Sequence, residues 1–110
     1  MYLTDVVFVK LDNKAVFIPT NKISHVMLEG RYCRLFVDGE KLTVRSSLKQ
    51  IETNINNKAF VKIYRSTLLN LNYLKEIHIK DKLVLLTNGV QLSISTRYLD
   101  KLVKLYPAFS

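Results

Sequence analysis

Cysteine, glycine, proline and tryptophan are all scarce in this sequence. Its 110 residues include one cysteine, three glycines, two prolines and no tryptophan. The lone Cys33 excludes an intramolecular disulfide and leaves no cysteine framework for structural zinc. Few glycines and prolines, with 48% hydrophobic residues, are typical of a packed globular chain rather than a disordered or fibrous one. We therefore expect a single domain over residues 1–110 in a reducing, cytoplasmic environment.

Long apolar runs and glycine-rich loops are also missing. No stretch approaches the roughly 18 apolar residues that a membrane-spanning helix needs, and Asp5 lies where a signal peptide would be apolar. The glycines are isolated, whereas phosphate-binding loops need them closely spaced before a helix. His25 and His78 lie in separate strand-like segments with no metal-ligand or nucleophile pattern beside them. The sequence thus predicts no membrane segment, no metal, no cofactor, no small-molecule substrate and no enzymatic activity.

Acidic residues are few compared with basic ones. Seventeen Lys and Arg against nine Asp and Glu give a net charge of +8. Such a charge favours a polyanionic partner through long-range attraction and counterion release. The same charge could serve solubility alone. The placement of the basic residues therefore has to distinguish a polyanion-binding surface from a generally charged one.

Short strand-like runs dominate the chain. Three segments each read as two strands around a tight turn: residues 6–19 around Asp12-Asn13, 31–44 around Asp38-Gly39, and 82–94 around Asn88-Gly89. The positive φ preferences of Asn88-Gly89 predict a type I′ turn. Strands are also predicted at residues 60–63 and 75–79, and short apolar runs occupy residues 22–28 and 68–71.

Two short helices are predicted. The pattern Ser47-Leu48-Lys49-Gln50 has the spacing of a capping box, and Ile51 and Ile55 continue an apolar stripe behind it. A second helix is expected over residues 96–106, with four apolar residues on one face: Leu99, Leu102, Val103 and Tyr106. Many hairpins with two short helices indicate a mainly β fold built from antiparallel sheets.

Four segments carry a resemblance to a known family: ISHVMLEGRYCRLFV, VRSSLKQIE, FVKIYRSTLLNLNYLKEI and VLLTNGVQLSISTRYLDKL. The third is the most specific, with Phe60, Tyr64-Arg65-Ser66 and Asn70 at fixed offsets. The fourth adds Asn88-Gly89, then a serine and an arginine at the start of a helix. Together these segments resemble the LytTR family of bacterial DNA-binding domains over nearly the whole chain, although that family usually has His where this chain has Tyr64.

The resemblance implies an elongated array of small antiparallel sheets with one or two short helices. Three loops, rather than a recognition helix, would enter successive major grooves. Base contacts are implied for four residues of these loops: Arg31, Tyr32, Arg65 and Arg97. An arginine fork can grip guanine O6 and N7 together, although phosphate contact is the alternative for each arginine. Candidates for phosphate or sugar contacts, or for a solvated surface, are Arg34, Arg45, Lys49, Lys62, Ser66 and Tyr98. Asn70 and Asn72 are expected to be structural, bonding their loop's backbone.

The function implied by the resemblance is that of a bacterial transcription regulator of the response-regulator, two-component type. It would bind promoter direct repeats in double-stranded DNA, with dimerisation on the DNA. A receiver domain or membrane segment commonly precedes this family's domain and none precedes Met1, so we expect either an excised C-terminal domain or a stand-alone regulator.

Two other functions fit the composition. An RNA-binding or single-strand-binding β module would stack bases on exposed tyrosines, although we expect most candidates to be half-buried strand residues: Tyr2, Tyr32, Tyr64 and Tyr73. A protein-interaction domain would instead use the positive charge to meet an acidic partner. Preference for single strands would indicate the first alternative, and indifference to DNA sequence would indicate the second.

Overall fold

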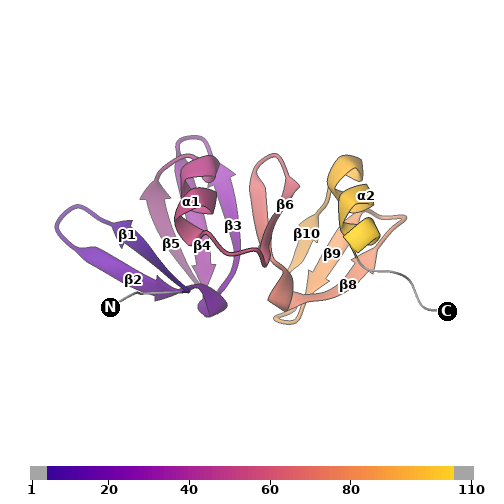
Figure 1. Cartoon of the computed structure of the whole chain (residues 1–110), viewed down its shortest axis with the longest axis horizontal. Coiled ribbons are helices and arrows are strands. Elements are labelled where there is room, and N and C mark those ends of the chain that lie inside the picture. The colour runs from indigo at the N-terminus through magenta and orange to yellow at the C-terminus, as the bar shows by residue number, and fades with distance from the viewer. Residues whose placement is uncertain (1–4, 106–110) are drawn as a thin grey trace.

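The computed structural model describes residues 5–105 of the chain (Figure 1). The elements, in chain order, are β1 (Val6–Lys10), β2 (Ala15–Pro19), the 3-10 helix η1 (Thr20–Lys22), β3 (Ile23–Glu29), β4 (Tyr32–Val37), β5 (Glu40–Arg45), α1 (Leu48–Ile55), β6 (Phe60–Tyr64), β7 (Thr67–Asn70), the 3-10 helix η2 (Leu71–Tyr73), β8 (Leu74–His78), β9 (Leu83–Leu86), β10 (Gln91–Ser93) and α2 (Thr96–Leu105).

The strands form three antiparallel sheets arranged along one axis. A two-stranded sheet, β1-β2, lies at one end, a five-stranded sheet with the order β5-β4-β3-β7-β6 lies in the middle, and a three-stranded sheet, β10-β9-β8, lies at the other end (Figure 1). The extents are 51 × 33 × 23 Å. The mainly β, elongated and antiparallel architecture expected from the sequence is confirmed.

Two hydrophobic clusters lie on opposite faces of β7. Leu68 belongs to the cluster under α1, whereas Leu69 belongs to the cluster under α2. Successive side chains of a strand point to opposite faces, so this short strand contributes to both clusters. The two helices are thereby held on a common central sheet.

The three expected hairpins are present, but one turn differs from its prediction. Leu85 pairs with Gln91, and Leu86 N donates to Val90 O at 2.9 Å, which leaves a three-residue loop. Gly89 has φ +88°, but Asn88 does not have a positive φ. The type I′ prediction is therefore wrong, because this register requires a loop of three residues rather than two, closed by a left-handed glycine.

Both predicted helices are confirmed. Gln50 N donates to Ser47 Oγ at 3.1 Å and Ser47 N donates to Gln50 Oε1 at 3.3 Å, which completes the capping box. In α2, Leu99 and Leu102 are buried, but Val103 is 40% exposed. The predicted apolar face is therefore wider than the buried stripe, because the narrow end sheet covers only part of it. Tyr106 lies outside the described residues.

Asn70 joins the two halves of the central sheet through its side chain. Its amide nitrogen donates to Ile23 O at 2.9 Å and to Thr20 O at 3.4 Å, and its oxygen accepts from Asn72 N at 3.0 Å. The residue is 1% exposed. This geometry confirms a structural role for Asn70.

We expect Asn70→Ala to lower the free energy of unfolding by about 1–3 kcal/mol, because buried polar groups would lose their partners. Asn72→Ala is the control. Asn72 is exposed, so its substitution should cost less than about 0.5 kcal/mol. Urea unfolding of both variants measures the difference, and equal losses would contradict the role assigned to Asn70.

His25 is buried in β3 rather than available for chemistry. It is 2% exposed, its ring stacks on Phe36 with centroids 4.1 Å apart, and its Nδ1 lies 2.8 Å from Ser24 Oγ. Burial disfavours the charged imidazolium and lowers the pKa of His25 from 6.5 to about 4. Folding therefore requires a neutral ring at this position.

We expect acid to destabilise the protein through His25. Between pH 6.5 and about 4 the unfolded chain binds a proton that the folded chain does not, so stability is complete above pH 6.5 and falls as the pH drops. The full loss is about 3 kcal/mol. Urea unfolding between pH 7 and pH 4 measures it, with His25→Gln as the comparison. Identical pH dependence in the variant and the wild type would contradict this account.

Candidate nucleic-acid interface

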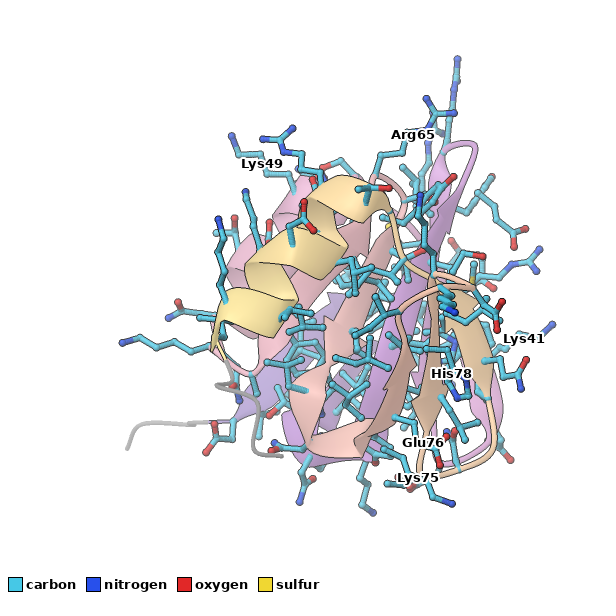
Figure 2. The ribbon with its side chains drawn as sticks, turned by 90° about the vertical axis from the view of Figure 1, so that its right-hand side faces the viewer. Lys41, Lys49, Arg65, Lys75, Glu76 and His78 are labelled. Carbon is cyan, nitrogen blue, oxygen red and sulfur yellow. The ribbon has the colours of Figure 1, made fainter. Side chains whose placement is uncertain are left out.

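Four connections between elements lie along one long edge of the molecule. They are the β3–β4 turn, the β5–α1 junction, the β6–β7 turn and the β10–α2 junction, all at the top of Figure 1. The view along the long axis places Lys49 and Arg65 on this side and Lys75 on the opposite side (Figure 2). We name this surface the basic edge, defined by Arg31, Arg45, Lys49, Arg65 and Arg97.

Backbone hydrogen bonds fix the spacing of these connections. Leu28 N donates to Ser66 O at 2.8 Å, which ties the end of β3 to the β6–β7 turn. Ser95 N donates to Ile63 O at 2.9 Å, which ties the β10–α2 junction to the end of β6. The buried Cys33 donates from Sγ to Ser46 O at 3.3 Å. Two of these links join main-chain atoms and the third comes from a buried thiol, so the connections are held in register without help from their exposed side chains.

Two of the three predicted reading arginines, Arg31 and Arg65, lie on these connections, and Arg97 lies just after a third. Arg31, Arg65 and Arg97 are all exposed, and none of them has an ion pair among residues 5–105. Arg97 lies in the first turn of α2 rather than in a loop, and its guanidinium carbon is 5.7 Å from the centre of the Tyr98 ring. The structure thus brings all three cations to one edge with their forks available to a ligand.

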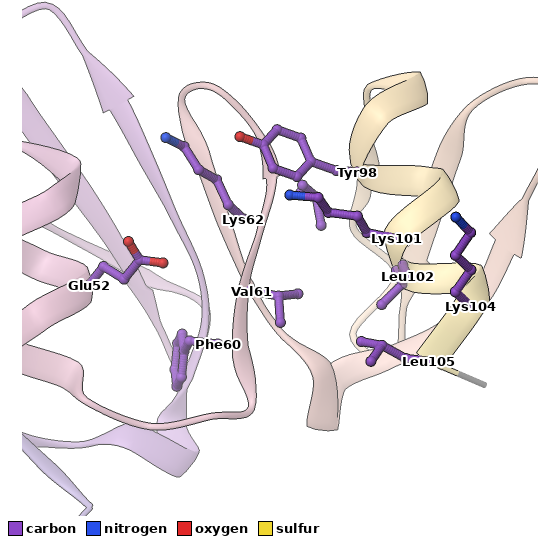
Figure 3. Close-up of a pocket in the computed structure, with 10 residues that line it drawn as sticks. Glu52, Phe60, Val61, Lys62, Tyr98, Lys101, Leu102, Lys104 and Leu105 are labelled. Carbon is purple, nitrogen blue, oxygen red and sulfur yellow. The ribbon is translucent and has the colours of Figure 1, made fainter.

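Five of the six candidate phosphate contacts have no ion pair among residues 5–105, whereas Arg34 has one. Arg45 and Lys49 are exposed on the edge, and the half-buried Ser66 and Tyr98 lie at its turns. Lys62 is half-buried on β6. Its charged end and the Tyr98 hydroxyl lie on the same side of the pocket that both residues line (Figure 3). Arg34 differs, because its guanidinium pairs with Glu29 at 3.2 Å. That partner offsets the charge a phosphate would need, so Arg34 is the least suited of the six.

Two tyrosines are more exposed than the sequence suggested. Tyr32 is 49% exposed at the start of β4, and Tyr64 is 40% exposed beside Arg65. The expectation that most of the candidate tyrosines are half-buried fails for these two, and Tyr64 lies next to an irregularity in the β6–β7 register between residues 62 and 64. Tyr73 is half-buried and donates its hydroxyl to Asn21 O at 2.7 Å. Tyr2 lies outside the described residues.

Negative charge on the β4–β5 hairpin is kept away from the basic edge. Tyr32 pairs with Arg45 at the edge end of the hairpin, and Val37 pairs with Glu40 at the far end, beside Asp38. The two acidic residues of the hairpin thus lie at the end away from the edge, where Lys41 also lies. A polyanion approaching the edge meets the positive end.

Both α-helices begin at the basic edge. Neither has an acidic residue in its first turn, and each has a cation as its second residue, Lys49 in α1 and Arg97 in α2. The amino end of a helix carries partial positive charge, which disfavours a cation and favours an anion. The placement is unfavourable for the isolated helix but suited to a phosphate ligand.

The chain is an elongated antiparallel module with cations along a row of fixed turns, which is the arrangement of a polyanion-binding domain. The profile of the LytTr DNA-binding domain matches residues 13–106, so the chain belongs to this family of DNA-binding domains that regulate transcription. This finding confirms the resemblance noted in the sequence.

Two relatives agree with this placement. The chain is 32% identical over 74 residues, 66% of its length, to the sensory transduction protein LytT of Oceanobacillus iheyensis. It spans only 30% of the length of that relative. The fold matches that of the LytTr DNA-binding domain of a methyl-accepting/DNA response regulator from Bacillus cereus, with a TM-score of 0.77, 22% identity, and coverage of 93% of this chain and 96% of that one. Across residues 5–105, the helices are too short or too polar to traverse a bilayer.

We expect Lys49→Glu to separate stability from DNA binding. Removing a cation from the amino end of α1 should raise the free energy of unfolding by about 0.3–1 kcal/mol. The same change should weaken binding to all duplexes alike and reduce the dependence of log K on log salt by about one unit or more. Fluorescence anisotropy at several salt concentrations measures the binding.

Lys75→Glu is the matched control, because it changes the charge equally on the side opposite Lys49 (Figure 2). Its effect on binding should be much smaller than that of Lys49→Glu. If both variants weaken binding to the same extent, net charge rather than the basic edge determines affinity.

Proposed function

We propose that this chain reads a specific sequence in double-stranded DNA through the turns of its basic edge. The observation that carries the proposal is the row of three exposed, unpaired arginines, Arg31, Arg65 and Arg97, on connections tied together by main-chain hydrogen bonds within residues 5–105. A rigid row of planar forks suits the guanine edge in the major groove, at about 1–3 kcal/mol of discrimination for each good pair.

The residues around these arginines position the duplex. Arg45, Lys49 and Lys62, with Ser66 and Tyr98, contact phosphate or sugar and set the register without reading bases. Tyr32 lies next to Arg31 in the chain and contacts base edges beside it. Arg34, already paired with Glu29, makes at most a secondary contact.

The biological setting of the proposal is a bacterial, cytoplasmic transcription regulator. The relative from Oceanobacillus iheyensis is named a sensory transduction protein, and the Bacillus cereus domain belongs to a response regulator. We propose the same setting for this chain, as one non-enzymatic domain spanning residues 1–110 that serves as the DNA-binding part of a two-component pathway. It would bind promoter direct repeats, with two copies on one duplex.

A second candidate is single-strand binding, favoured by the exposure of Tyr32 and Tyr64 beside the basic edge. A competition between duplex and single-stranded oligonucleotides of the same sequence distinguishes the two. A preference for the duplex is the expected result, and a preference for the single strand would replace the proposal.

Selection of bound duplexes from a random library at physiological salt tests base reading. Wild type should enrich one motif. The triple variant Arg31→Ala, Arg65→Ala, Arg97→Ala should enrich none while keeping weak non-specific binding. The corresponding triple lysine variant keeps the charge but lacks the fork, so it should retain the non-specific affinity and lose the motif. Enrichment of the wild-type motif by the lysine variant would mean that charge alone selects the site.

A further inference from the structure

The outer face of the β1-β2 sheet is apolar and uncovered among the described residues. The register pairs Val6 with Pro19, Phe8 with Phe17 and Lys10 with Ala15. The residues that alternate with them on the inner face, such as Val7, Val9 and Ile18, are buried against α1 and the central sheet. Phe8 and Phe17 are 51% and 55% exposed, and their rings meet edge to face with centroids 5.2 Å apart. We name Phe8 and Phe17 the phenylalanine patch.

A second apolar feature lies at the other end of the molecule. A hollow of about 290 Å³ lies between α2 and the end of β8, lined by Ile79, Leu99, Asp100, Val103 and Lys104. Ile79 is 60% exposed and Val103 is 40% exposed. We name this feature the end hollow.

The β1-β2 sheet, which carries the patch, and α2 with β8, which border the hollow, lie at opposite ends of the 51 Å long axis, and the connections of the basic edge lie between them (Figure 1). Two copies lying in the same direction along one duplex would bring the phenylalanine patch of one copy to the end hollow of the next. The hollow offers apolar walls to an aromatic ring. Its acidic residue, Asp100, is opposite in charge to Lys10 beside the patch, while Lys104 lines the same hollow. A symmetric contact of patch with patch would leave the hollow without a partner.

We propose that copies of this chain associate head to tail, with the phenylalanine patch of one copy seated in the end hollow of its neighbour. The alignment of copies along DNA rests on the proposed function, but the contact itself does not. A contact built from so few side chains falls well below the roughly 1,000 Å² of a stable interface, so free copies associate weakly. Two copies on one duplex are at an effective concentration in the mM range, where a weak contact becomes significant.

The first experiment uses the protein without DNA. Sedimentation velocity is measured from micromolar concentrations to about 1 mM, the range reached on a duplex. Wild type should form dimers and longer chains as the concentration rises. The double variant Phe8→Ser, Phe17→Ser and the variant Val103→Glu should each remain monomeric. All three substitutions are at exposed positions, and circular dichroism checks that the variants are folded.

A mixture of the two variants gives the sharpest result. The serine variant retains an intact hollow and the glutamate variant retains an intact patch, so the mixture should form one-to-one dimers and nothing longer. Loss of association in the serine variant alone, with Val103→Glu behaving as wild type, would overturn the proposal in favour of a patch-to-patch dimer. A wild type that stays monomeric at 1 mM would also overturn it, because a contact absent at that concentration contributes nothing on DNA. So would association that neither variant reduces.

The second experiment uses a duplex with two copies of the motif selected by wild type. The second copy should bind about tenfold more tightly than the first when the motifs are direct repeats, which corresponds to about 1.4 kcal/mol. The factor should fall to one for either variant and for inverted motifs, while binding to a single motif is unchanged. Equal cooperativity in direct and inverted orientations would contradict the head-to-tail contact. If no motif is selected, the proposed function fails while the sedimentation result still stands.

Discussion

The antiparallel pairing of β3 with β7 holds the two halves of the central sheet together. It joins residues forty or more positions apart, with His25 opposite Leu69 and Met27 opposite Thr67. At one end of the pair, Leu28 N bonds to Ser66 O and sets the β3–β4 turn beside the β6–β7 turn. At the other end, the Asn70 side chain bonds to Ile23 O. The same pairing therefore closes the core and places two of the three arginines.

Binding and stability make opposite demands at the basic edge. A carboxylate in the first turn of α1 or α2 would complement the helix dipole, yet Lys49 and Arg97 stand there instead. The fold tolerates these cations because its stability comes from the two hydrophobic clusters, which lie on the faces of the central sheet. The turns of the basic edge are also rigid. The turns are fixed by the main chain, so ordering the scaffold costs little when DNA binds.

Much of the fold could be predicted because its signals are local. Asp38-Gly39 and the Ser47 capping box each act within four residues. Arg31, Arg65 and Arg97 lie at positions given by the sequence motifs of the family. The remaining features depend on partners distant in sequence. The pairing of Glu29 with Arg34, the exposure of Tyr64 at a register irregularity and the shallow burial of Val103 all follow from how the strands and α2 pack. The alternation around Phe8 indicates a face, but only the packing of Val7 and Val9 tells which face is inward.

Methylation interference at guanine N7 shows whether the arginines of the basic edge read bases. On the selected duplex, we expect interference at guanines whose major-groove edges face one side of the helix, all within the roughly 15 base pairs that the 51 Å long axis can span. Each single change among Arg31→Ala, Arg65→Ala and Arg97→Ala should remove the interference at one of these positions and leave the others. Interference by phosphate ethylation without any at guanine N7 would contradict the account, because the basic edge would then hold the backbone without reading the sequence.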